Sequence, residues 1–131
     1  MPIELISIIV DDYDAAIAWF TNVLGFSLVE DVPSLTNDGR MKRWVVVRPP
    51  NAQAGILLAK ADGDVQRAAI GAQFAGRVGL FLRVDDFEET LARLRAANAA
   101  IVTVPRDEAY GRVVVFRDLC GNKWDLLGPR P

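Results

Sequence analysis

The chain has 131 residues, of which 51% are hydrophobic and 24% charged, which suits one globular domain or two small modules that share a core. Fifteen basic and seventeen acidic side chains give a net charge of −2, which argues against a nucleic acid or an anionic membrane surface as the main partner. No apolar run approaches the roughly 20 residues of a membrane-spanning helix.

Cysteine and histidine usage narrows the chemistry further. Cys120 is the single cysteine, which excludes an internal disulfide and fits a reducing compartment. The N-terminal segment has no basic stretch and soon meets an acidic pair, unlike a signal peptide, so we expect a cytoplasmic protein. The absence of histidine excludes Ser-His-Asp and Cys-His catalysis.

The first elements are an apolar strand and an amphipathic helix. Residues 4–10 are rich in Ile and Val and predict a buried strand. Asp11 or Asp12 then caps a helix, because a carboxylate oxygen there can accept a hydrogen bond from a free backbone N–H. The apolar face of that helix recurs at helical spacing: Tyr13, Ala16, Ile17, Phe20 and Leu24.

Three strands complete the first half, at residues 26–32, 44–48 and 56–59. The polar segment 33–43 contains Asn37-Asp38-Gly39, which is typical of a tight hairpin or loop. Residues 60–76 then join the halves, with a short helix predicted over 65–74. This segment is either a cover for a pocket mouth or a plain surface connection.

The second half begins like the first, with a strand at 77–84 and a helix at 87–97. A strand at 100–104, a charged loop at 106–111 and two strands, 112–117 and 123–127, follow.

The two halves repeat each other. A shift of 74 residues (10 to 84) places VDDYD of Val10–Asp14 on VDDFE of Val84–Glu88. A shift of 69 (44 to 113) places WVVVR on VVVFR. The sequence therefore predicts a duplicated module, with module one at about 1–60, a linker at about 61–76 and module two at about 77–131.

Three segments resemble the vicinal oxygen chelate superfamily, the group of glyoxalases, extradiol dioxygenases and bleomycin-resistance proteins. They are VDDYDAAIAWFTNVLGF, RVDDFEETLARL and GRVVVFRDLCGNKWDLL. The last is the most specific, through its Asp-x-x-Gly-Asn turn and the acidic residue on the returning strand. The resemblance implies an α+β fold in which two βαβββ modules form a curled mixed sheet around a cleft, the glyoxalase/bleomycin resistance/dioxygenase fold. It also implies a homodimer with a cleft lined by both chains.

The resemblance also implies where a metal would be held. Enzymes of the superfamily bind one divalent metal through four residues, two per module. Those positions fall on Leu5, on Ile56 (or Leu57 if a loop differs by one residue), on Gly79 and on Asp125. Leu, Ile and Gly side chains cannot donate to a metal, and one carboxylate holds Mg²⁺ or Mn²⁺ only weakly. We therefore expect no cofactor, with a divalent metal as the minority alternative.

Strand alternation extends the implied positions to a set of cleft residues, with no catalytic residue identified. Side chains two residues apart on a strand face the same way. The fourth strand contributes Ile56 and Leu58 to the cleft. The position of Trp44 along its strand does not fix the face to which its side chain points. The predicted ligand-binding residues are Ser7, Trp44, Leu58, Phe81, Arg83, Lys123 and Asp125. This apolar lining with a few charges suits an organic ligand.

Asp125 has three alternative roles: an ion pair with Arg83 or Lys123, a hydrogen-bond acceptor for a ligand, or a metal ligand or general base. The carboxylate pairs at 11–12 and 85–86 are better explained as helix caps than as catalytic acids.

Three functions follow. The leading hypothesis is a protein with a degenerate metal site that binds a small, partly apolar organic molecule in a dimeric cleft without a metal. The first alternative is a metal-dependent glyoxalase-like lyase or isomerase, or a dioxygenase, with unusual ligands. The second is a non-catalytic dimeric interaction module.

Overall fold

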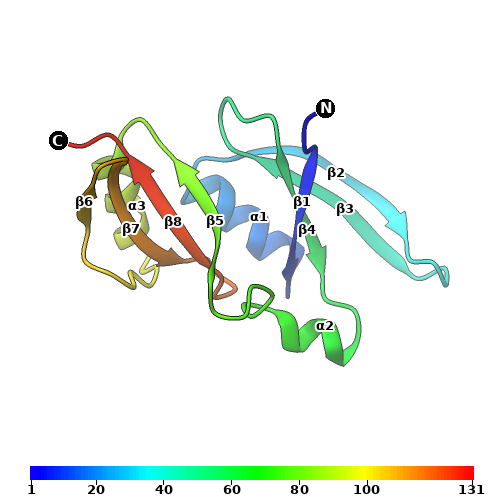
Figure 1. Ribbon diagram of the computed structural model, residues 1–131. Coiled ribbons are helices and arrows are strands. Elements are labelled where there is room, and N and C mark those ends of the chain that lie inside the picture. Colours follow the sequence, from blue (N-terminus) through cyan, green and yellow to red (C-terminus); the bar gives the residue numbers. More distant parts are fainter. The chain divides into compact units, whose positions relative to one another are not determined.

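Each half of the chain folds into a four-stranded mixed sheet with a helix against one face (Figure 1). The computed structural model describes residues 1–131. The chain forms two compact units, residues 1–70 and residues 71–131. The first unit contains β1 (Leu5–Val10), α1 (Tyr13–Asn22), β2 (Ser27–Leu35), β3 (Met41–Arg48), β4 (Gly55–Lys60) and α2 (Gly63–Ala69). The second contains β5 (Val78–Arg83), α3 (Phe87–Ala96), β6 (Arg106–Glu108), β7 (Gly111–Arg117) and β8 (Lys123–Gly128).

The two sheets share one topology. The strand order is β1-β4-β3-β2 in the first unit and β5-β8-β7-β6 in the second. In each, the first strand of the unit runs parallel to the last, and the other neighbours are antiparallel. This arrangement confirms the predicted α+β fold of two βαβββ modules.

Both long helices begin as the acidic pairs predict. Asp12 Oδ1 accepts a hydrogen bond of 2.8 Å from the Ala15 amide, and Asp86 Oδ1 accepts one of 3.0 Å from the Glu89 amide. Each carboxylate therefore satisfies an N–H group that the first turn of its helix leaves free.

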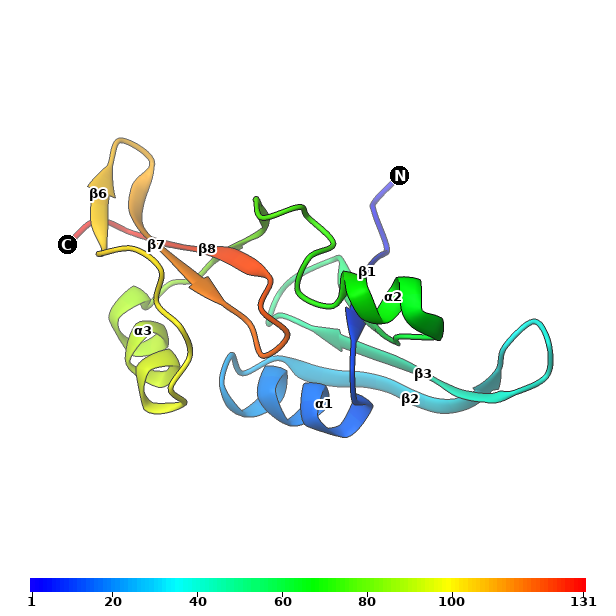
Figure 2. The ribbon, with the colours of Figure 1, turned by 90° about the horizontal axis from the view of Figure 1, so that it is seen from below.

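α1 and α3 each cover one face of the sheet of their own unit. The core of each unit lies between that helix and that sheet. In the first unit, where Figure 2 shows α1 along β2 and β3, Phe20 of α1 is fully buried. The strand side chains on the same face are buried as well: Ile8, Val10, Val45, Val47 and Leu58. In the second unit α3 contributes Leu91 and Leu94, and the Trp124 ring stacks on Phe116 with 5.8 Å between centroids. Burying each such side chain contributes roughly 1.5–3 kcal/mol.

The hairpin of β2 and β3 is longer than predicted. Residues 33–35 and 41–43, expected to be a loop, continue the ladder as far as the pair Leu35–Met41. Pro33 is compatible with this because β2 is an edge strand, where a missing N–H costs no ladder bond on the outer side. The turn itself falls at the predicted Asn37-Asp38-Gly39, with Gly39 at φ 86°.

The segment predicted as a strand at 100–104 is not one. It touches β7 through the single bridge Ile101–Phe116, and the Thr103 hydroxyl accepts a hydrogen bond from the Val115 amide in place of a backbone carbonyl. The ladder resumes only after Pro105, as β6, where the sequence predicts a charged loop. The short helix of the connecting segment also differs, since α2 spans Gly63–Ala69 rather than 65–74 and contacts β1.

The turn between β7 and β8 is built around the buried carboxylate of Asp118. Its Oδ1 accepts hydrogen bonds from the amides of Cys120, Gly121 and Asn122, at 2.9 to 3.1 Å. Its Oδ2 accepts from Asn122 Nδ2 and from the Trp124 indole, at 3.2 and 2.9 Å. Asp118 thus fixes the turn and ties it to the core of the second unit.

Candidate functional site

The first unit contains a pocket where β3 and β4 separate. The two strands pair only at Val46–Leu57 and Val47–Ile56, although β3 begins at Met41. Over the remaining length β3 stays paired with β2, and β4 stays paired with β1. The first residues of β3 and the last residues of β4 therefore stand apart and leave an opening in the sheet.

A tyrosine of α1 occupies part of this opening. β3 lies between β2 and β4, so its amides face these two neighbours alternately. The Arg43 amide donates to the Tyr13 hydroxyl at 3.2 Å, and the Arg43 guanidinium lies 5.0 Å above the Tyr13 ring. Tyr13 thus receives an N–H that a continued ladder would direct to β4.

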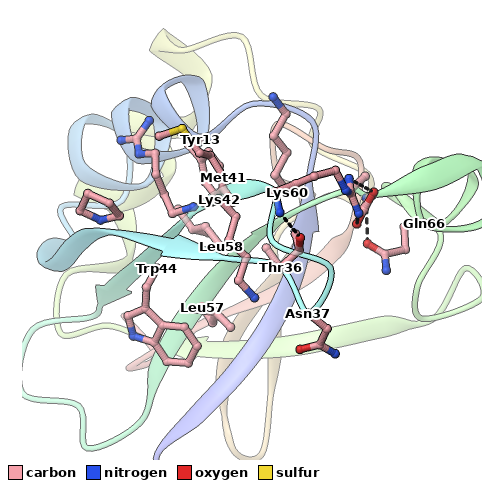
Figure 3. A pocket seen from close by; sticks show the side chains of 16 residues that line it. Tyr13, Thr36, Asn37, Met41, Lys42, Trp44, Leu57, Leu58, Lys60 and Gln66 are labelled. Carbon is pink, nitrogen blue, oxygen red and sulfur yellow. Dashed lines mark hydrogen bonds and ion pairs between the residues drawn. The ribbon is translucent and has the colours of Figure 1, made fainter.

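The pocket has a volume of about 900 Å³, within the size range of sites for drug-sized ligands. Its wall combines apolar and aromatic surface with charged groups at the ends of the strands. The lining residues are Tyr13, Pro33, Thr36, Asn37, Arg40, Met41, Lys42, Arg43, Trp44, Leu57, Leu58, Ala59, Lys60, Ala61, Asp62 and Gln66. In Figure 3 the Trp44 indole and the Leu57 side chain lie together at the lower left, and Gln66 lies at the right.

Arg43 is held by acids on one side of the pocket. Its guanidinium donates to Asp31 at 2.7 and 3.0 Å and to Asp14 at 2.9 Å. These hydrogen bonds hold the pKa of Asp31 below its ordinary value, and they raise the pKa of Arg43. Arg43 therefore links α1 to the β2–β3 hairpin as a permanent cation.

Arg40 links the tip of the hairpin to the start of α2. Its two terminal nitrogens donate to both oxygens of Asp62 at 3.0 and 2.8 Å, and its Nε donates to Asp38. The hydrogen bonds from Arg40 lower the pKa of Asp62, so this carboxylate stays ionised. The Asp62 amide in turn donates to the Gln66 side chain at 2.8 Å. These contacts connect the two strand ends between which the pocket opens.

Two of the predicted binding residues line this pocket, Trp44 and Leu58, and Ser7 does not. The register pairs Ser7 with Leu57, so Leu57 shares its face and Leu58 belongs to the opposite, helix-covered face. The expectation that Leu58 faces the same way as Ser7 is therefore wrong. Leu58 is fully buried in the core and only borders the pocket.

The other four predicted residues lie together on the second sheet. Phe81 and Arg83 of β5 project from the face opposite α3, as does Asp125, which is paired with Phe81 in the register. Phe81 is 65% exposed. Lys123 shares this face by strand alternation. The four side chains therefore share one face of the second sheet, and their part in a ligand-binding cleft stays a prediction.

Asp125 is the one carboxylate of this face with a raised pKa. Burial raises it, and the positive charge of Arg106 partly opposes the effect. No ion pair joins Asp125 to Arg83 or Lys123, so that alternative for its role is wrong.

The positions implied for a metal do not fit one. The register selects Leu57 rather than Ile56 as the counterpart of Asp125, since Ser7–Leu57 in β1–β4 corresponds to Phe81–Asp125 in β5–β8. Leu5, Leu57 and Gly79 offer no side-chain donor, which leaves one carboxylate. No group of three or more Cys, Asp or Glu side chains elsewhere is placed to hold a metal ion.

Several residues of the pocket were not predicted as site residues: Tyr13, Arg40, Lys42, Arg43, Lys60 and Asp62. The sequence predicts Tyr13 on the apolar face of a helix and the others in a loop or at a strand end. The one available signal was the excess of basic residues at 40–43 beside the β-forming run that follows.

Two βαβββ modules, each a mixed sheet with a helix on one face, define a duplicated α+β protein with a pocket in its first module. The chain belongs to the Glyoxalase/Bleomycin resistance protein/Dioxygenase superfamily, whose model matches residues 3–126. An uncharacterized protein from Shewanella frigidimarina is 45% identical over 123 residues, which cover 93% of this chain and 89% of the relative.

Solved structures agree with this assignment. The chain is similar to UcmS2, with a TM-score of 0.78 and 28% identity over 97% of both chains. It is also similar to TnmS3, an antibiotic binding protein from Streptomyces sp. CB03234, with a TM-score of 0.75, 27% identity and coverage of 98% of this chain and 96% of that one. No helix of the chain combines the length and apolarity that crossing a membrane demands.

Proposed function

We propose that the protein binds a small, partly apolar organic molecule without a metal, and that the pocket between β3 and β4 forms the centre of the site. The observation that carries the proposal is the pocket of about 900 Å³ with the Trp44 indole and Leu57 in its wall. An indole offers a large, rigid apolar surface for a flat ligand. The likeness to TnmS3, described as an antibiotic binding protein, supports the same function.

The donor set supports binding over metal-dependent catalysis. Leu5, Leu57 and Gly79 stand where a metal enzyme of the superfamily would have ligands, so a Lewis-acid mechanism would have to rely on Asp125 alone. We further propose that the working form is a cytoplasmic homodimer. Phe81, Arg83, Lys123 and Asp125 would then complete the cleft of that dimer.

Calorimetric titration of chelator-treated protein with a library of aromatic metabolites and antibiotics tests the proposal. We expect at least one ligand to bind with one-to-one stoichiometry per chain, and Trp44→Ala to weaken it about tenfold. Val65→Ala, which removes an exposed apolar side chain of α2 outside the pocket, is the control and should leave the affinity unchanged. A library without a ligand, together with turnover that depends on an added metal ion, would overturn the proposal.

A further inference from the structure

Cations outnumber anions among the charged side chains that line the pocket. Four of them are cations, Arg40, Lys42, Arg43 and Lys60, and one is an anion, Asp62. The chain as a whole carries a net charge of −2, so the pocket wall has the opposite sign from the protein. A wall of this kind attracts anions, because the charges of the lining act on a ligand at short range.

The two arginines are already engaged. Arg40 is bound to both oxygens of Asp62 and to Asp38, and Arg43 is bound to Asp31 and Asp14. Of these acids only Asp62 reaches the lining. The counter-charges of the arginines are therefore Asp14, Asp31 and Asp38, which lie outside the lining, and Asp62, which belongs to it. These ion pairs fix the shape of the pocket wall.

The two lysines have no such partner. Neither Lys42, on β3, nor Lys60, at the end of β4, forms an ion pair. They stand on the two strands that separate, and alternation directs them to opposite faces: Lys42 shares the face of Trp44 and Leu57, whereas Lys60, paired with Val10, lies on the helix-covered face. An anion beside the Lys42 ammonium group would supply its missing counter-charge on the face that carries Trp44.

We infer that the ligand of this pocket is an organic anion with a planar aromatic body, whose acidic group lies beside Lys42 and whose ring lies against Trp44 and Leu57 on the same face of the sheet. The inference rests on the proposed function and adds the charge class of the ligand. A carboxylate, sulfonate or phosphate supplies the same chemistry, since each accepts charge-assisted hydrogen bonds from ammonium groups.

Three naphthalenes of matched shape test the charge class: 2-naphthoate, the neutral 2-naphthamide and the cationic 2-(aminomethyl)naphthalene. Calorimetric titration at low ionic strength should give the tightest binding for 2-naphthoate and the weakest for the amine. The advantage of the acid over the amide should shrink as sodium chloride is added, because salt screens exposed charges.

Variants assign the effect to Lys42. Lys42→Met should weaken 2-naphthoate about threefold to fivefold, the range of an exposed ion pair, and leave 2-naphthamide within about twofold. Lys60→Met, on the opposite face, should weaken 2-naphthoate less than Lys42→Met does. Lys42→Arg should retain most of the affinity for the acid. The matched control is Arg95→Gln, which removes the same charge from the exposed face of α3.

The outcomes separate this inference from the function on which it rests. Equal affinity of the acid and the amide, or a Lys42→Met variant that weakens both alike, overturns the anion inference and leaves a binding protein. Binding of none of the three naphthalenes at millimolar concentration also overturns it. The proposed function then depends on the separate library titration.

Discussion

The two units share one topology but differ in how far their last two strands pair, and the pocket lies where this pairing is missing. In the second unit β7 and β8 pair over six residues each, from Arg112–Gly128 to Arg117–Lys123. In the first unit the equivalent strands, β3 and β4, pair at two positions only. A duplicated module has therefore kept a closed sheet in one copy and an open one in the other.

Equivalent residues explain the opening. Tyr13 corresponds to Phe87 (a shift of 74) and Arg43 to Arg112 (a shift of 69), and in both units the guanidinium lies over the aromatic ring, at 5.0 and 5.6 Å. The aromatic residue of the second unit lacks the hydroxyl that receives the β3 amide in the first. The cation–aromatic contact is thus common to both units, whereas the hydroxyl is specific to the open one.

The residue at the end of the last strand differs as well. Gly128 corresponds to Lys60 (a shift of 68), and a Cβ atom at Gly128 would lie 2.6 Å from Phe87 Cβ. The closed ladder therefore requires glycine beside the ring. Lys60 has a side chain at the equivalent position of the first unit, where β3 and β4 do not pair.

The largest effect is expected at the turn that closes the second sheet. Asp118→Ala removes the acceptor of five hydrogen bonds and leaves buried donors unpaired, so we expect a loss of about 3 kcal/mol in the free energy of unfolding. Urea denaturation followed by circular dichroism measures it. Asp11→Ala, an exposed carboxylate that caps no helix, should change stability by less than about 0.5 kcal/mol. Similar losses for both variants would refute the role of Asp118.

The glycine position sharpens the comparison of the ladders. Gly128→Ala should cost about 2 kcal/mol, because the new methyl group overlaps Phe87 and the strand must shift. The matched change in the open unit, Lys60→Ala, should cost less than about 0.5 kcal/mol, since the Lys60 side chain is exposed. Equal costs in a denaturation series would show that the two positions do not differ in packing.

The tyrosine hydroxyl should contribute less. Tyr13→Phe copies the residue of the closed unit and removes the acceptor of the Arg43 amide, so we expect a loss of about 1 kcal/mol. Amide hydrogen exchange should become faster at Arg43 and stay unchanged at Val47, which is paired with β4. An unchanged rate at Arg43 would mean that Tyr13 does not protect this amide.

The smallest effect concerns Asp125 and its dependence on pH. Because burial raises its pKa in the folded protein, its contribution to stability is full below the ordinary pKa of an aspartate and is lost as pH rises through the raised value. Asp125→Asn, which stays neutral, should therefore be more stable than the wild type at about pH 7, and the gap should close toward about pH 4. A gap that widens on acidification would contradict the raised pKa.

The duplicated fold followed from the sequence because local signals repeat in it. The acidic caps Asp12 and Asp86 and the alternation of apolar residues act over a few positions, and both survive in the structure. Phe81, Arg83 and Asp125 share one face of the second sheet because the register of β5 and β8 is continuous from Leu80 to Arg83.

The pocket could not be predicted in the same way. It depends on where β3 and β4 stop pairing and on the contact of Tyr13 with Arg43, two residues far apart in the sequence. Leu58 was assigned to the wrong face because the loop before β4 is one residue longer than its counterpart, and a shift of one residue reverses every side chain of a strand. The strand predicted at residues 100–104 is not formed because the Thr103 hydroxyl, rather than a backbone carbonyl, accepts the hydrogen bond from the Val115 amide.

The most direct test of the account is to map the bound 2-naphthoate on chelator-treated, ¹⁵N-labelled protein by two-dimensional NMR. The account predicts shifts at the Trp44 indole N–H and at the amides of residues 41–44 and 57–60, without any added metal. Shifts confined to β5 and β8, or binding that appears only when a divalent metal is supplied, would contradict it.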